Sequence, residues 1–236
     1  GGDETVSQKQ WESLPNFMEG NEEKVLPMVD VSGSMNCPAG NNPNLTCMDV
    51  AISLGIYIAE RNEGTFKDSF LTFSSNPQLQ YINSGSLKDK LRQLKSAEWG
   101  MSTNIEATFD LLLNQAVAHN IPQAEMPTKI LILSDMEFDA ATSKRWGNDG
   151  SEWNPTVMDL IKTKYEEAGY KLPTIVYWNL NARTDNFPVR QDEMNTALIS
   201  GFSPSILKSV LNGENLTPYS VMMKTVDSDR CENITV

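Results

Sequence analysis

The sequence predicts an α/β domain with a mostly parallel sheet, and three observations support this prediction. Short, continuously apolar segments such as KILIL at 129–133 and TIVYW at 174–178 are typical of strands buried on both faces. Segments with helical periodicity separate these strands along the chain. No linker-like stretch interrupts the alternation after residue 24. Alternating strands and helices indicate one parallel sheet covered by helices.

The elements follow one another in a regular order. We expect strands at 24–31, 67–73 and 78–81, the last two joined by a turn at 74–77, and helices at 48–61 and 87–94. Thr46 is the predicted N-cap of the helix at 48–61. The helix at 105–118 carries its apolar residues on one face. Further along we expect strands at 129–133, 174–178 and 196–199, helices at 156–168 and 203–211, a loop at 146–154 and an extended piece at 218–225.

Composition limits the class of protein. The 236 residues include 19 Lys and Arg against 31 Asp and Glu, which gives a formal net charge of −12. That charge argues against binding nucleic acid or anionic membranes through bulk electrostatics. No apolar run approaches the about 18 residues of a membrane span. We expect one domain at 24–236 after a polar, loose lead-in at 1–23, in which Gly1 and Gly2 look like a cloning remnant on a fragment of a longer protein.

Histidine and cysteine usage excludes several chemistries. One His and three Cys leave no His-rich metal cage, no dense disulfide framework and no CxxC pair. A Ser-His-Asp triad would need His119, which is predicted to end a helix, where a positive charge suits the helix dipole. Cys37 and Cys47 flank an insertion at 36–46. We expect them to be free thiols in an intracellular protein, with a disulfide or redox pair as the open alternative.

The stretch DVSGSM at 30–35, at the end of the first predicted strand, carries most of the chemical information. Asp30, Ser32 and Ser34 alternate, so one extended turn directs three oxygens toward one point, and Gly33 lets the backbone bend between them. In an open α/β sheet, ligands bind beyond the carboxyl ends of the strands. A turn with an Asx cap and no metal is the plainer interpretation.

Two more oxygens follow along the chain. Thr103 lies next to Ser102 in a Gly-bearing loop before the helix at 105–118, and Asp135 ends the segment KILILSD. Carboxylates and hydroxyls suit a hard divalent cation such as Mg²⁺. Two carboxylates only just balance the cation's charge, so we expect an open position that attracts an acidic group from a partner.

These three parts, in this order, resemble the metal-ion-dependent adhesion site of von Willebrand factor A domains. The resemblance implies that Mg²⁺, or Mn²⁺ or Ca²⁺, contacts Asp30, Ser32, Ser34, Thr103 and Asp135. It also implies a three-layer, Rossmann-like fold. Its mostly parallel six-stranded sheet would have the order 3-2-1-4-5-6, a short antiparallel strand at one edge and helices on both faces.

A finer resemblance extends along the chain. SDMEFD at 134–139, YWNLNAR at 177–183 and the run at 200–211 resemble a little-characterised family of cellular and viral proteins. In that family an A-type domain is fused to a Ro/TROVE-like helical-repeat region. The resemblance implies an RNA-binding, ribonucleoprotein role for the whole protein. It assigns the RNA contacts to a helical region N-terminal to this acidic fragment. Separately, the odd number of cysteines and the lack of an apolar signal core favour an intracellular, cytoplasmic location.

Several residues are predicted near the rim of the site. Glu137 and Asp139 would support the ligands or form a second cation site, although solvated loop acids are the default interpretation. Arg183 is a rim candidate, whereas Trp178 favours packing. Gly33 and Ser102 complete this set.

We expect a binding domain and not an enzyme. One alternative is a phosphoesterase or nuclease that uses the same cation as a Lewis acid, which an assay with Mn²⁺ would separate. Another is a purely structural domain that closes a ring formed by the helical region. A phosphotransferase with Asp30 as nucleophile would need a second acid two residues on, where Ser32 stands.

Overall fold

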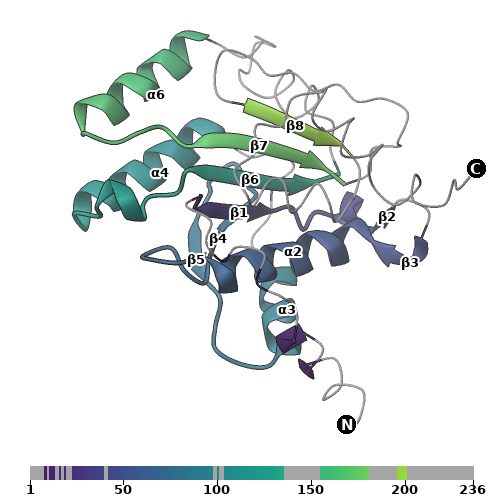
Figure 1. Ribbon diagram of the computed structural model, residues 1–236. Coiled ribbons are helices and arrows are strands. Elements are labelled where there is room, and N and C mark those ends of the chain that lie inside the picture. Colours follow the sequence, from purple (N-terminus) through teal and green to yellow (C-terminus); the bar gives the residue numbers. More distant parts are fainter. Residues whose placement is uncertain are drawn as a thin grey trace, which may run out of the picture.

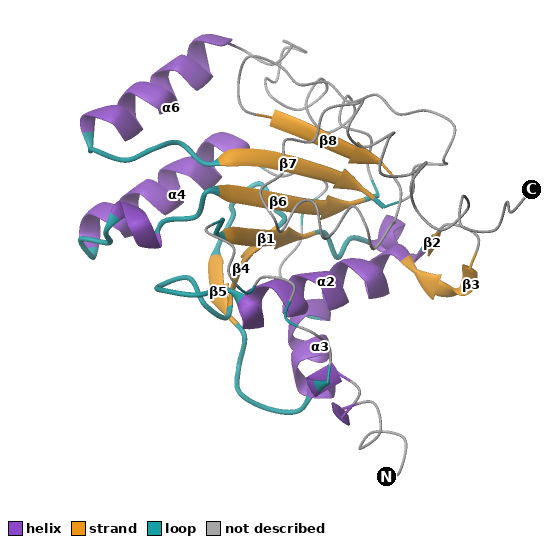
Figure 2. Ribbon diagram, in the orientation of Figure 1, coloured by secondary structure: helices purple, strands orange, loops and turns teal. Residues whose placement is uncertain are grey.

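A six-stranded sheet forms the centre of the domain (Figures 1 and 2). The computed structural model describes residues 8–9, 11–13, 16, 19, 23–39, 42–97, 100, 104–135, 155–180 and 196–200. The strands are β1 (Val25–Val29), β4 (Ser69–Thr72), β5 (Leu79–Tyr81), β6 (Lys129–Ser134), β7 (Thr174–Asn179) and β8 (Thr196–Ser200). They lie in the order β5-β4-β1-β6-β7-β8, with β5 antiparallel to β4 and all other neighbours parallel. Counted along the chain within this sheet, the order reads 3-2-1-4-5-6.

Helices cover both faces of the sheet, which confirms the predicted α/β class. The helices are α2 (Cys47–Arg61), α3 (Leu87–Lys95), α4 (Ile105–Ala118) and α6 (Pro155–Glu167). Successive residues of a strand point to opposite faces. Val25 and Val29 therefore pack into the core on the side of α2, and Leu26 and Met28 into the core on the side of α4. No helix in the described part of the chain has the length and apolar character needed to cross a bilayer.

Local sequence signals explain where the helices begin and end. The Thr46 hydroxyl accepts a hydrogen bond from the Asp49 backbone N–H, and the Asp49 carboxylate accepts one from the Thr46 N–H. This capping box satisfies donors that the first turn of a helix leaves free, and it confirms Thr46 as the N-cap. His119 is the C-cap of α4, so this helix ends where it was predicted to end. The segments predicted at 146–154, 203–211 and 218–225 lie outside the described residues.

The insertion after the DVSGSM motif folds into a small hairpin that the sequence did not predict. A short 3₁₀ turn, η1 (Gly33–Asn36), leads into β2 (Pro38–Ala39), which pairs antiparallel with β3 (Asn42–Thr46). The hairpin extends beyond the sheet at the start of α2 (Figure 2). β2 and β3 form a two-stranded sheet of their own, separate from the main sheet.

A glycine lets α2 lie against the central strand. Gly55 faces β1, and a Cβ atom built on it would lie only 2.6 Å from Val29 Cγ2. Val is stiff at χ1, so this methyl group cannot swing aside freely. The absence of a side chain at Gly55 therefore sets the distance between the helix and the strand that carries Asp30 at its end.

We expect Gly55→Ala to destabilise the domain by about 1–2 kcal/mol, because overpacking a core outweighs the better helix propensity of Ala. Urea unfolding followed by circular dichroism measures this change. The cost of Gly55→Ala should be smaller when it is measured in a Val29→Ala background, which makes room for the new methyl group. A Gly55→Ala variant as stable as the wild type would show that the helix shifts freely on the sheet.

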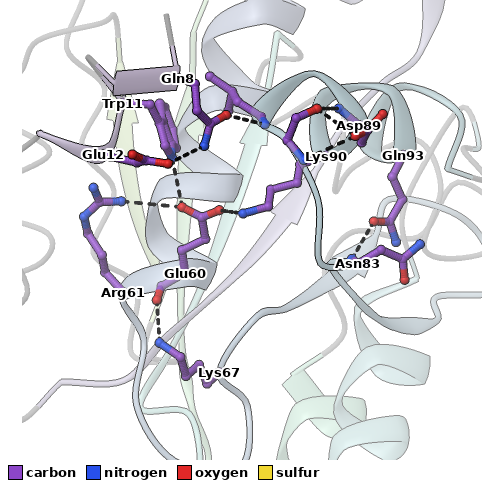
Figure 3. Close-up of polar contacts among 12 residues, drawn as sticks. Gln8, Trp11, Glu12, Glu60, Arg61, Lys67, Asn83, Asp89, Lys90 and Gln93 are labelled. Atoms are coloured by element: carbon purple, nitrogen blue, oxygen red, sulfur yellow. Dashed lines mark hydrogen bonds and ion pairs between the residues drawn. The ribbon is translucent and has the colours of Figure 1, made fainter. Parts of the chain in front are cut away.

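The described part of the lead-in docks on α2 and α3 (Figure 3). The indole Nε1 of Trp11 donates to Glu60 Oε2 at 2.9 Å, and its ring stands edge-on to Tyr57. The guanidinium of Arg61 lies 3.9 Å from the centroid of the Tyr57 ring, and Glu60 forms an ion pair with Lys90 of α3. The expectation of a loose lead-in is therefore wrong around Trp11.

Candidate metal centre

The two predicted carboxylates meet at one edge of the sheet. Parallel neighbours β1 and β6 end side by side, with Val29 opposite Leu133. Asp30 follows β1 directly, and its backbone N–H donates to the Leu133 carbonyl at 3.0 Å. Asp135 directly follows β6. Register alone thus brings residues distant in the sequence to the same place.

Asp30 is a fully buried carboxylate. Its Oδ1 accepts from the Ser32 N–H at 2.9 Å, and its Oδ2 accepts from the Ser134 hydroxyl at 2.8 Å. Burial raises the pKa of Asp30, the nearby charge of Asp135 acts in the same direction, and the hydrogen bonds from Ser32 and Ser134 oppose it. In the described part of the chain, no basic side chain forms an ion pair with Asp30 or Asp135. A buried negative charge without a counter-charge costs free energy, which a cation would offset.

A run of oxygens leads from the buried end of the site to its surface. Ser32 Oγ lies 3.0 Å from Ser34 Oγ, which donates to Asp135 Oδ1 at 3.0 Å. Ser32 is buried, whereas Ser34 is exposed. The structure therefore brings together Asp30, Ser32, Ser34 and Asp135, and the site opens outward at its Ser34 end.

Gly33 does not have the predicted conformational role. It is absent from the described glycines with positive φ, and a Cβ built on it would meet nothing within 4 Å. Gly33 is the first residue of the 3₁₀ turn η1, a conformation that any residue can adopt.

The fifth predicted ligand, Thr103, lies outside the described residues, as does its neighbour Ser102. The residues that flank them are tied to the same edge of the sheet. Gly100 N–H donates to the Phe73 carbonyl at 2.9 Å, and Asn104 N–H to the Ser74 carbonyl at 3.2 Å, just beyond β4. Because β4 is the neighbour of β1, the loop begins and ends at the carboxyl edge that carries Asp30.

Two serines at this edge were not predicted as site residues. The Ser134 hydroxyl donates to the Asp30 carboxylate. The only sequence signal for this role is that a small hydroxyl residue ends an apolar strand. Ser74 Oγ is buried without a hydrogen-bond partner among the described residues. A buried hydroxyl left in this way indicates a polar group that the described residues do not supply.

The other predicted residues do not join the described site. Glu137, Asp139 and Arg183 lie outside the described residues. Trp178 is fully buried, in keeping with packing. His119 ends α4, whose first residue follows the Asn104 contact at the carboxyl edge, so the helix carries His119 away from that edge.

The donor set decides which cation the site suits. The described residues hold no group of three or more His, Cys, Asp or Glu side chains that could bind a metal. What they offer is two carboxylates and hydroxyls, an all-oxygen set suited to Mg²⁺ or Ca²⁺ and poorly suited to Zn²⁺. The residues present therefore fit a hard divalent cation.

Most of the chain is similar to known proteins. A family model described as "Domain of unknown function (DUF7788)" matches residues 24–234. The uncharacterized protein L728 of Acanthamoeba polyphaga mimivirus is 30% identical over 223 residues, covering 93% of this chain and 36% of that protein. The Deinococcus radiodurans RO (RSR) protein has a TM-score of 0.53 and 19% identity, covering 86% of this chain and 36% of that one. BatB from Bacteroides thetaiotaomicron has a TM-score of 0.41 and 12% identity, covering 86% and 99%.

These similarities show the fold of the chain and how much of each relative's length it covers. The similarity to the Ro protein, at 19% identity, shows a shared fold. The chain spans only about a third of the length of the mimivirus relative and of the Ro protein, 36% in each case.

Proposed function

Because the chain belongs to the DUF7788 family, whose function is unknown, we propose a function from its site: divalent-metal-dependent ligand binding by a von Willebrand A-type domain. Mg²⁺, with Mn²⁺ or Ca²⁺ as alternatives, is held by Asp30, Ser32, Ser34, Thr103 and Asp135. The observation that carries this proposal is the fully buried Asp30 carboxylate, which has no described counter-ion and lies at the inner end of the oxygen site.

A bound cation would offset the charges of Asp30 and Asp135 and offer a Lewis-acidic position to an oxygen ligand. The site opens at Ser34, which is exposed, so that ligand approaches from outside the domain. We propose a carboxylate from a partner protein, because a carboxylate adds the negative charge that the hydroxyl ligands do not supply. An RNA phosphate is the weaker candidate at a net charge of −12.

The proposal extends to the whole protein. We propose that this domain is part of a Ro-like, RNA-binding protein of the cytoplasm, in which a helical region outside this chain contacts the RNA. The fold shared with the Ro protein and the short span of the chain, 36% of that protein, support this division. The domain itself would bind its partner without catalysing a reaction.

Titration of the domain with Mg²⁺ or Mn²⁺ in a calorimeter tests the metal site. We expect one site in the wild type, and about 2.7 kcal/mol of added stability at a cation concentration 100 times the dissociation constant. Asp135→Asn should lose both effects, because it removes one of the two carboxylates. Asp110→Asn is the matched control, since Asp110 pairs with Lys164 between α4 and α6 and not at this edge. Unchanged cation binding in Asp135→Asn would refute the assignment.

A further inference from the structure

The hairpin beside the metal centre is closed at its base by two cysteines. Pro38 of β2 pairs with Thr46 of β3, so Cys37 and Cys47 face each other one position further out. Cys47 N–H donates to the Cys37 carbonyl at 2.9 Å. Their Sγ atoms lie 3.1 Å apart, and both residues are thiols.

This arrangement needs little movement to form a disulfide. The backbone hydrogen bond from Cys47 to Cys37 and the short distance between their sulfurs already hold the two residues close together. The two sulfurs need only to approach from 3.1 Å to the bond length of about 2.05 Å.

The two thiols differ in exposure. Cys37 is half-buried at the surface, whereas Cys47 is fully buried at the first turn of α2. Burial raises the pKa of Cys47, and the neighbouring Cys37 and Asp135 act in the same direction. A reagent from solution therefore meets Cys37 first, and Cys47 can attack only the sulfur beside it.

We propose that Cys37 and Cys47 form a redox-active dithiol that exchanges with small disulfides of the glutathione class. In the first step the Cys37 sulfur bonds to one sulfur of oxidised glutathione, whose S–S bond breaks, and the Cys37 proton passes to the departing sulfur. In the second step the Cys47 sulfur bonds to the Cys37 sulfur, and the second glutathione leaves with the Cys47 proton. Two protein thiols are oxidised and one glutathione disulfide is reduced to two thiols.

The modification would act at the outward end of the metal centre. Cys37 Sγ lies 4.0 Å from Asp135 Oδ2, and Cys37 follows directly after η1, which contains Ser34. A bond from Cys37 to the first turn of α2 fixes the base of the hairpin and removes the Cys37 thiol hydrogen from the neighbourhood of Asp135. The surface on which a partner approaches thus takes a different form in each redox state.

The test uses the full chain carrying Cys231→Ser, which leaves only the two thiols in question, in glutathione buffers from reducing to oxidising. All buffers contain EDTA, so the outcome is independent of the proposed metal function. After an acid quench, free thiols are counted with a maleimide and the intact mass is measured. We expect both thiols to disappear in a single transition, with the loss of two hydrogen atoms, no attached glutathione, and full recovery on reduction.

Single-cysteine variants separate the two steps. Adding Cys47→Ala should stop the exchange at glutathione attached to Cys37, and adding Cys37→Ser should leave Cys47 unmodified because it is buried. Circular dichroism checks that each variant is folded. In the two-cysteine chain, thiols that persist in the most oxidising buffer, or glutathione that stays attached to Cys37, would overturn the proposal.

Discussion

Asp30→Asn should abolish divalent-cation binding and, at neutral pH, make the metal-free domain more stable than the wild type. The Asn side chain has the same shape, so its oxygen can accept from the Ser32 N–H and its amide can donate to Ser134 Oγ, both of which now contact the carboxylate. What disappears is a fully buried negative charge. The proposed cation ligand thus reduces the stability of the empty domain.

The difference in stability between Asp30→Asn and the wild type should depend on pH. Burial raises the pKa of Asp30 above the ordinary value of 3.8, so the folded state binds the proton more tightly than the unfolded state. The free energy of unfolding of the wild type therefore falls as pH rises from the unfolded pKa to the folded pKa, and stays lower above it. Asn does not titrate, so the advantage of the variant should be smallest in acid and complete once Asp30 is ionised.

Urea unfolding in EDTA at a series of pH values measures this difference, which we expect to favour the variant at neutral pH and to shrink in acid. Calorimetry with Mg²⁺ should show an affinity lowered at least about 100-fold. Asp110→Asn serves again as the control, with neither effect. An Asp30→Asn domain that binds Mg²⁺ like the wild type would remove Asp30 from the site.

The second large effect is expected at Trp178. Trp178→Ala should cost about 3–5 kcal/mol, because it empties a large volume in the core between the sheet and α2. Trp178 lies opposite Leu133, next to the end of β6, and its ring is fully buried in the core. Cation affinity of the folded protein should therefore be unchanged.

Thermal unfolding measures the stability of this variant, and Trp178→Phe provides a milder one that keeps an aromatic ring in the core. We expect Trp178→Phe to lose less stability and to bind Mg²⁺ normally. Weakened Mg²⁺ binding in folded Trp178→Phe would mean that the ring positions the ligands and does more than fill the core.

The sequence predicted the elements of the sheet because their signals are local. KILIL at 129–133 is typical of a buried strand, and Thr46 with Asp49 three residues on has the chemistry of a capping box. The four described ligand candidates of the metal centre came from the same source, since residues that directly follow parallel strands share one edge.

The features that sequence analysis missed depend on tertiary contacts. The insertion at 36–46 is rich in Asn and Pro and shows no strand alternation, so the hairpin of β2 and β3 was not visible in it. Ser134 became part of the site only through the register of β6 against β1. A single Trp11 in a polar stretch gave no sign of a docking surface, because that surface is made by α2 and α3.

The docking of Trp11 has a mechanical consequence. β1 is the strand that begins the domain and ends at Asp30, and it is hydrogen-bonded to parallel neighbours on both sides. Tension applied to the chain before residue 8 would reach the Gln8 contact with the Leu87 backbone and the Trp11 contact with Glu60 before it reached β1. These contacts would transmit the tension to α2 and α3 (Figure 3). A force on the chain before residue 8 would therefore break these two contacts first, while β1, which positions Asp30, stays in register with its neighbours.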